Sequence, residues 1–161
     1  MAAFYQLIRP NTAELSPRSP KATHMANSHH IEKTRAIFKP DNLVTLKDVS
    51  DNFFMELNRD FGSFAGHVLV SQFAFDEAWP TWEIHPAGDE LVFLLSGDTD
   101  LVLASEEGQS EDIVRVSNPG DYVVVPKGTW HTARPYAPTS MLFLTPGEGT
   151  INALKPGGDP L

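Results

Sequence analysis

Two short segments of the chain carry side chains of the types that bind metal ions. Glu83 and His85 are two residues apart in a run that is typical of a strand, so their side chains point to the same face. Glu90 follows the turn-forming residues 86–89 and begins the apolar run Leu91–Leu95. The turn therefore brings a third polar side chain next to the first two.

The second segment places His131 in a comparable position. The apolar run Asp121–Val125 ends at the turn signal Pro126-Lys127-Gly128, and His131 lies just beyond that turn. Two hairpin-like segments that each present imidazole or carboxylate groups beside buried strands provide what a metal site on a β-scaffold needs.

Buried charge gives these four side chains a reason to bind a cation. A carboxylate inside a small barrel is unfavourable unless it is paired or bound to a cation, and Glu83 and Glu90 also repel each other. A divalent cation removes that repulsion, and protonation of one Glu is the competing solution. The donor set Glu83, His85, Glu90 and His131 suits a divalent ion of Fe, Mn, Ni, Co or Zn and leaves coordination positions open.

The same residues resemble the two sequence motifs of the cupins. The first motif reads Glu83-x-His85, four residues, Glu90, six residues, Gly97, with Glu83 where the family has a leading His. The second motif is matched by Gly120, Pro126, Gly128 and His131. The resemblance covers residues 72–144 and implies a single-domain cupin.

The resemblance allows three functions. The first is a metal-dependent enzyme that acts on a small oxygenated substrate as a dioxygenase, isomerase or lyase, with Glu83 as a ligand or a general base. The second is a non-catalytic module that binds or senses a metal or small ligand. The third is a metal-free cupin similar to sugar epimerases, in which His85 and Tyr122 would act as acid and base. The fold alone does not choose among them.

The elements that must position these residues are short strands separated by turn signals. The strands are expected at residues 42–46, 66–75, 81–85, 90–95, 99–104, 112–116, 121–125, 129–134 and 140–144. Turns are expected at 96–98, 106–108 and 118–120, and a helix capped by Ser50 or Asp51 is one interpretation of residues 48–62. The pattern predicts an all-β fold, an antiparallel double-sheet jelly roll or β-barrel. Residues 1–30 are expected to be a loosely ordered extension and residues 31–161 the single barrel domain.

Strand parity also sorts the side chains around the site. Trp82 and Trp130 alternate away from the predicted ligands. For these two and for Trp79, packing between the sheets or across a dimer face is favoured over a role in an apolar pocket wall. Arg134 also alternates away from His131, which favours a surface salt bridge. Gln72 shares a face with Val68 and Val70 and is a candidate to reach the cavity.

Composition limits the classes of partner. The chain has 161 residues, and its 12 basic and 21 acidic residues give a net charge of -9, which argues against nucleic acid or an anionic membrane and favours a small-molecule ligand. There is no cysteine, so any metal must use nitrogen and oxygen ligands. No apolar run is long enough for a membrane span or a signal peptide, and a cytoplasmic location is expected. The outward positions of Leu91, Phe93 and Leu95 predict a homodimer.

Overall fold

The computed structural model describes residues 27–104 and 110–161. Within these ranges the chain forms antiparallel strands and one short helix. The strands are β1 (Thr34–Phe38), β2 (Val44–Asp48), β3 (Val68–Phe75), β4 (Trp82–Ile84), β5 (Glu90–Ala104), β6 (Glu111–Val116), β7 (Tyr122–Val125), β8 (Trp130–Thr145) and β9 (Ile151–Ala153), and the helix is α1 (Phe53–Asp60). The predicted all-β fold class is confirmed.

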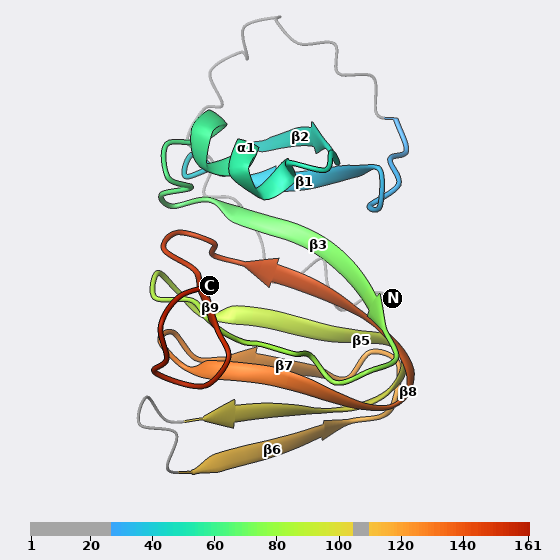
Figure 1. Ribbon diagram of the computed structural model, residues 1–161. Helices are drawn as coiled ribbons and strands as arrows, with labels where there is room; N and C mark the ends of the chain where they lie inside the picture. The colour runs from blue at the N-terminus through green and yellow to red at the C-terminus, as the bar shows by residue number, and fades with distance from the viewer. Residues whose placement is uncertain (1–26, 105–109) are drawn as a thin grey trace, which may run out of the picture.

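The strands of the described residues form one sheet that curls around an interior. Its order is β2-β1-β3-β8-β4-β9, and β5 pairs with β6, β7 and β8. The strand β8 joins the two parts, because β5 runs along one of its edges while β3 and β4 pair with different parts of the other. Figure 1 shows the curled strands, with β1, β2 and α1 at one end and β6 at the other.

Alternation along β5 explains how a carboxylate enters this interior. Val92 and Leu94 are fully buried, and Glu90 lies on the same face two residues earlier. Leu95 points the other way and is 41% exposed. The main core cluster is built from Val92, Leu94, Leu101, Val116, Val123, Val125, Ala133, Met141 and Phe143. The register that buries this core also buries the Glu90 side chain.

Residues 96–98 do not form the predicted turn but a bulge within the continuous strand β5. Pairing with β8 continues through this point with shifts of register. Gly97 has a φ of 96°, and a Cβ atom there would lie 2.4 Å from the carbonyl oxygen of Pro138. A bulge bends a strand without ending it. The predicted strands 129–134 and 140–144 are likewise parts of one strand, β8.

Two short strands were not predicted. β1 contains the apolar residues 36–38, and β9 lies in the C-terminal tail that was expected to be turn-rich surface. Ala153 of β9 is fully buried, and β9 pairs with β4 beside the candidate site. A strand of three residues is too short for its alternation to be recognised in the sequence.

The segment with the uncertain helix does contain α1. Its N-cap is Asn52, not Ser50 or Asp51, and it makes no side-chain capping hydrogen bond. Phe53 and Leu57 are four residues apart and buried on one face of the helix. Their partners in this second core cluster are Ile37, Phe64 and Leu69. These contacts fix α1 against β1 and β3, next to the candidate site.

Two predictions lie outside the described residues in whole or in part. These are the turn at 106–108 and residues 1–26 of the predicted N-terminal extension. In the described ranges, none of the helices has the length and apolar character needed to cross a membrane.

Candidate metal centre

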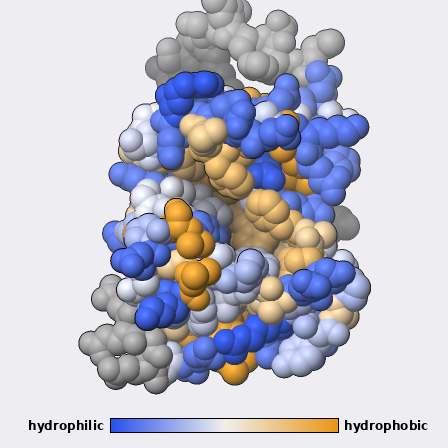
Figure 2. Space-filling model, viewed as in Figure 1, coloured by the Kyte–Doolittle hydropathy of each residue, from blue (hydrophilic) through white to orange (hydrophobic). Residues whose placement is uncertain are grey.

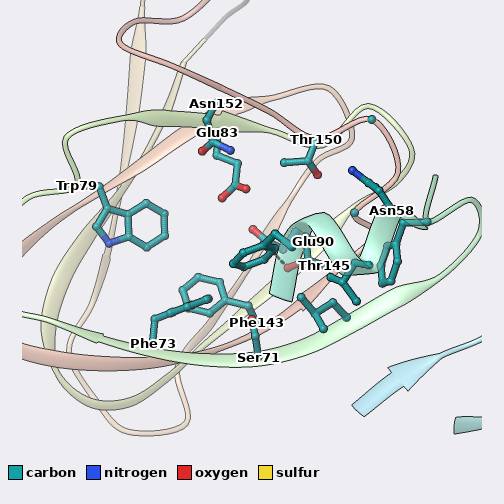
Figure 3. Close-up of a pocket in the computed structure, with 16 residues that line it drawn as sticks. Asn58, Ser71, Phe73, Trp79, Glu83, Glu90, Phe143, Thr145, Thr150 and Asn152 are labelled. Carbon is teal, nitrogen blue, oxygen red and sulfur yellow. Dashed lines mark hydrogen bonds between the residues drawn. The ribbon is translucent and has the colours of Figure 1, made fainter. Parts of the chain in front are cut away.

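Strand pairing brings polar side chains from three strands together. Glu83 of β4 lies opposite His131 of β8 on one side and Asn152 of β9 on the other. Side chains of directly opposed residues lie on the same face of a sheet. Figure 3 shows Glu83 and Asn152 side by side, with the Glu83 carboxylate directed into the cavity toward Glu90.

All four predicted ligands meet in one cluster. One ligand atom each from Glu83, His85 and His131 lies within 4.8 Å of the others. The carboxylate of Glu90 contacts both imidazoles, with Oε1 3.3 Å from Nε2 of His85 and Oε2 3.1 Å from Nε2 of His131. The two rings lie 5.2 Å apart between centroids. The grouping that the sequence predicted from two separate hairpins is therefore present.

The cluster contains buried polar atoms that lack hydrogen bonds. Glu90 and His85 are each 2% exposed and His131 is fully buried. Nε2 of His85, Nε2 of His131 and Oε2 of Glu90 have no hydrogen-bond partner in the described part of the chain, although they converge. Leaving such atoms unsatisfied is costly, and a bound cation would satisfy all three. Nitrogen and carboxylate donors are what divalent transition metals accept, so the residues fit such an ion.

A surrounding set of polar groups orients the cluster. The Thr145 hydroxyl donates a hydrogen bond to Oε1 of Glu90. Nδ1 of His85 shares a hydrogen bond of 2.8 Å with the hydroxyl of Thr150. A second hydrogen bond on the distal nitrogen fixes the tautomer and orientation of an imidazole ligand. The Nε2 atom of His85 is thereby left facing the other members.

Burial and mutual charge shift the pKa values in the cluster. Burial raises the pKa of Glu83, and the Glu90 charge adds to that effect while His85 and His131 oppose it. Burial also acts to raise the pKa of Glu90, but the contacts with His131 and His85 outweigh it and lower the pKa to about 2. Burial tends to lower the pKa of His131, yet the Glu90 carboxylate raises it overall. The two carboxylates therefore have different protonation behaviour.

A cavity of about 450 Å³ adjoins the cluster. Glu83 and Glu90 form part of its wall, together with Trp79 and side chains of α1, β3 and β8. Figure 3 shows Trp79, Phe143 and Phe73 around one part of the cavity and Asn58 of α1 at another. Figure 2 shows apolar side chains gathered in the middle of one face of the molecule, between more polar regions. The cluster therefore borders a space large enough for a small organic molecule.

The tryptophans divide between core and cavity. Trp130 is 5% exposed and packs with Ile84 and Trp82, on the face away from the cluster, as predicted. Trp79 differs from the packing-only interpretation, because it lines the cavity and its ring lies 6.5 Å from that of His131. It lies outside any strand, so strand parity could not place it.

Two other predicted site residues lie elsewhere. Gln72 donates a hydrogen bond to Ser140 and does not line the cavity, because its neighbours Ser71 and Phe73 occupy the face of β3 that does. Tyr122 is 60% exposed on β7 and stacks on Phe93, so it is not placed to act with His85 as an acid–base pair. Arg134 forms an exposed ion pair with Glu111, as predicted.

Sequence reasoning missed the groups that orient the cluster. Thr145 lies at the end of β8, while Thr150 and Asn152 lie at β9, in a tail whose glycines and prolines predicted only turns. Single Thr and Asn residues carry no spacing signal of their own. They become recognisable only after β9 is known to pair with β4.

Comparison with protein-family models gives no match, and neither does a search of curated proteins. Solved structures do match. An oxalate oxidase structure is 19% identical, with 52% of this chain and 44% of that chain covered and a TM-score of 0.43. A cupin-2 domain protein from Shewanella frigidimarina is 15% identical over 49% of this chain and 70% of its own, with a TM-score of 0.41.

A third solved structure is a cupin superfamily protein from Desulfitobacterium hafniense, 23% identical over 48% of this chain and 65% of its own, with a TM-score of 0.40. The chain spans less than half the length of the oxalate oxidase chain. The chain forms a curled antiparallel sheet, and the solved structures that it resembles include proteins described as cupins.

Proposed function

We propose that the protein is a divalent-metal-dependent cupin enzyme that acts on a small oxygenated substrate bound in the cavity beside Glu83. The observation that carries this proposal is the convergence of three buried polar atoms without hydrogen-bond partners in the described residues, from His85, His131 and Glu90. Glu83, His85, Glu90 and His131 would hold the ion. A divalent cation held there would supply Lewis-acid polarisation of a substrate oxygen.

Glu83 is the residue we propose as the general base, after a substrate oxygen has displaced its carboxylate from the ion. It is the member of the cluster that is not fully buried, and its carboxylate faces the cavity where a substrate would lie. In the metal-free protein, burial raises the pKa of Glu83. Asn152 of β9 lies opposite it in the strand register.

Glu90 has a different role in this proposal. It lies beneath the two imidazoles, is 2% exposed and has a lowered pKa, so it stays ionised at neutral pH. The hydroxyl of Thr145 holds the carboxylate in place. Glu90 therefore supplies fixed negative charge, while Glu83 is free to gain and lose a proton. Separate roles for two carboxylates follow from their different surroundings.

Metal analysis tests the proposal directly. Protein purified without a nickel column should contain about one divalent transition ion per chain by mass spectrometry of the metal content. After dialysis against EDTA, adding Mn²⁺ or Zn²⁺ at about 100 times the dissociation constant should stabilise the fold by about 2.7 kcal/mol. The His85→Ala/His131→Ala double variant should lose this stabilisation. His29→Ala, a change at an exposed histidine remote in sequence from both motifs, serves as the control.

Two results would count against the proposed metal site. A wild-type protein that contains no transition ion and is not stabilised by any added ion would contradict the proposed function. Equal stabilisation of the wild type and the double variant would show that the ion binds elsewhere.

A further inference from the structure

The outer face of the sheet carries a row of apolar side chains that crosses six strands. Directly opposed residues of paired strands share a face, so the row can be followed from strand to strand through the register. It lies on the side away from the metal cluster, because its member on β5, Leu91, alternates with the inward-pointing Glu90 and Val92. From β2 through β1, β3, β8 and β5 to β7, the row consists of Leu46, Ala36, Val70, Leu144, Leu91 and Val124.

A second row beside the first extends this apolar surface. Leu142 of β8 lies opposite Gln72 of β3 on one side and Phe93 of β5 on the other. Phe93 in turn lies opposite Tyr122 of β7, and their rings stack with centroids 5.1 Å apart. These two rows contain no charged side chain, and their polar groups are the Gln72 amide and the Tyr122 hydroxyl.

The surface also continues on the other side of the first row. Phe38 of β1 and Val44 of β2 are directly opposed there. We call the two rows and this pair the outer face. Phe38, Val44, Leu46, Tyr122 and Val124 are each between 42% and 60% exposed, and the other members are half-buried. The outer face is therefore an apolar surface that nothing in the described part of the chain covers.

Its size is that of an interaction surface. Six strands spaced about 4.8 Å apart make it roughly 24 Å wide across the strands. The exposed apolar area amounts to several hundred Å², of the order of the roughly 800 Å² that each partner of a standard interface buries. A contiguous apolar surface of this extent on a soluble protein normally marks a site of contact with another macromolecule.

Charge and shape favour a second copy of the chain as the partner. The chain has a net charge of -9, so two copies repel each other wherever their acidic side chains meet. Contact through the outer face brings no charged members together. A twofold axis pairs the same surface of both chains, and sheets can pack face to face about 10 Å apart. A second outer face has the width needed to cover the first.

We propose that two copies of the chain associate about a twofold axis with their outer faces packed against each other. The sequence predicts a homodimer from Leu91, Phe93 and Leu95 of β5. The register adds the surface, which also includes β2, β1, β3, β8 and β7. The metal cluster lies on the opposite side of the sheet, so this association is independent of the proposed function.

The mass of the full chain in solution tests the proposal. Sedimentation of EDTA-treated protein at micromolar concentration should give twice the chain mass of 17.8 kDa. Leu142→Glu places a charge near the middle of the outer face, and the twofold axis buries it twice. It should raise the dissociation constant of the dimer at least about 100-fold. The control is Ile113→Glu, which adds the same charge at an exposed residue of β6, outside the outer face, and should leave the dimer intact.

A milder variant covers the case in which Leu142→Glu does not fold. The chain has no cysteine, so Val124→Cys introduces a single thiol at an exposed position of the outer face. This thiol should react with a thiol reagent at least about fivefold more slowly above the dissociation constant of the dimer than below it, because dimerisation limits access. The thiol of Ile113→Cys should react at the same rate at both concentrations.

Three results would overturn the inference. The first is the mass of a single chain at micromolar concentration. The second is a dimer in which the Val124→Cys thiol reacts equally fast at every concentration, because such a dimer uses another surface. The third is a single chain in which this thiol is protected throughout, because residues of the same chain, such as 1–26, would then cover the outer face. Loss of the proposed metal binding would leave the dimer unchanged, so the two proposals fail separately.

Discussion

Oε2 of Glu90 lies 3.1 Å from Nε2 of His131, and these two side chains are only 2% and 0% exposed. The other carboxylate oxygen of Glu90 lies 3.3 Å from Nε2 of His85, so one carboxylate connects the imidazoles of two separate motifs. The position of the two imidazoles relative to each other therefore depends on the charge of Glu90.

Replacing Glu90 by Gln should abolish tight metal binding. The amide keeps the size of the side chain but removes the negative charge between the two imidazoles. We expect the dissociation constant for Mn²⁺ to rise more than about 100-fold. This is more than the effect usually seen when a residue that hydrogen-bonds to a metal ligand is replaced. Calorimetric titration of EDTA-treated protein measures it, and Glu111→Gln is the control because that Glu is exposed in an ion pair with Arg134. Equal affinity in both variants would show that Glu90 does not contribute to the ion's site.

The metal-free protein should become less stable in acid because of Glu90. Its pKa is lowered in the folded state, so its ionised form stabilises the fold above the ordinary pKa of 4.5, and this contribution is lost as the pH falls toward about 2. The free energy of unfolding of the wild type, minus that of Glu90→Gln, should therefore decrease from pH 6 to pH 3 by an amount of order 2 kcal/mol. Urea unfolding at several pH values measures this difference. A constant difference over that range would contradict the assignment.

Thr150→Val should weaken metal binding without disturbing the fold. Valine has the shape of threonine but cannot share the hydrogen bond that fixes Nδ1 of His85. We expect a 10- to 100-fold weaker affinity, roughly the range for loss of such a partner. Thr150→Ser keeps the hydroxyl and should stay close to the wild type. If both variants bind equally, the orientation of His85 does not depend on this contact.

Gly97→Ala should destabilise the protein far more than Gly120→Ala. The two glycines have nearly the same positive φ, 96° and 99°. A Cβ at Gly97 would lie 2.4 Å from the carbonyl oxygen of Pro138, whereas nothing lies within 4 Å of one at Gly120. Gly120→Ala should cost about 1–3 kcal/mol of unfolding free energy from backbone strain alone, and Gly97→Ala should add the cost of the steric clash. Chemical denaturation compares them, and similar losses would contradict the close approach at the bulge.

The sequence predicted the cluster well because its members belong to regular patterns. Period-two alternation places Glu83 and His85 on one face, and the same alternation carries Glu90 inward with Val92. His131 follows a turn whose glycine and proline are easily recognised. These are local relationships, and the strands only had to pair in register to complete them.

The parts that could not be predicted depend on contacts between distant segments. Gly97 was interpreted as a turn because the same residue type serves turns and bulges, and only its approach to Pro138 distinguishes them. Thr150 reaches His85 only after β9 pairs with β4, across 65 residues of sequence. A lone Arg on a strand is normally exposed, and the burial of Arg35 of β1 depends on its contact with Phe53 of α1.

Glu83→Gln should separate the two roles of the carboxylates. Burial raises the pKa of Glu83, so the folded protein disfavours its ionised form, and the associated stability is present below its ordinary pKa and lost as the pH rises through the raised one. At neutral pH the neutral Gln should therefore make the metal-free protein slightly more stable than the wild type. Its affinity for Mn²⁺ should fall by about tenfold, less than in Glu90→Gln, because Glu83 borders the cavity where water can take its place. Thermal unfolding of the metal-free protein and calorimetry with Mn²⁺ give the two readouts. A variant that is less stable without metal and binds Mn²⁺ as weakly as Glu90→Gln would show that Glu83 is a fixed structural charge and not the base.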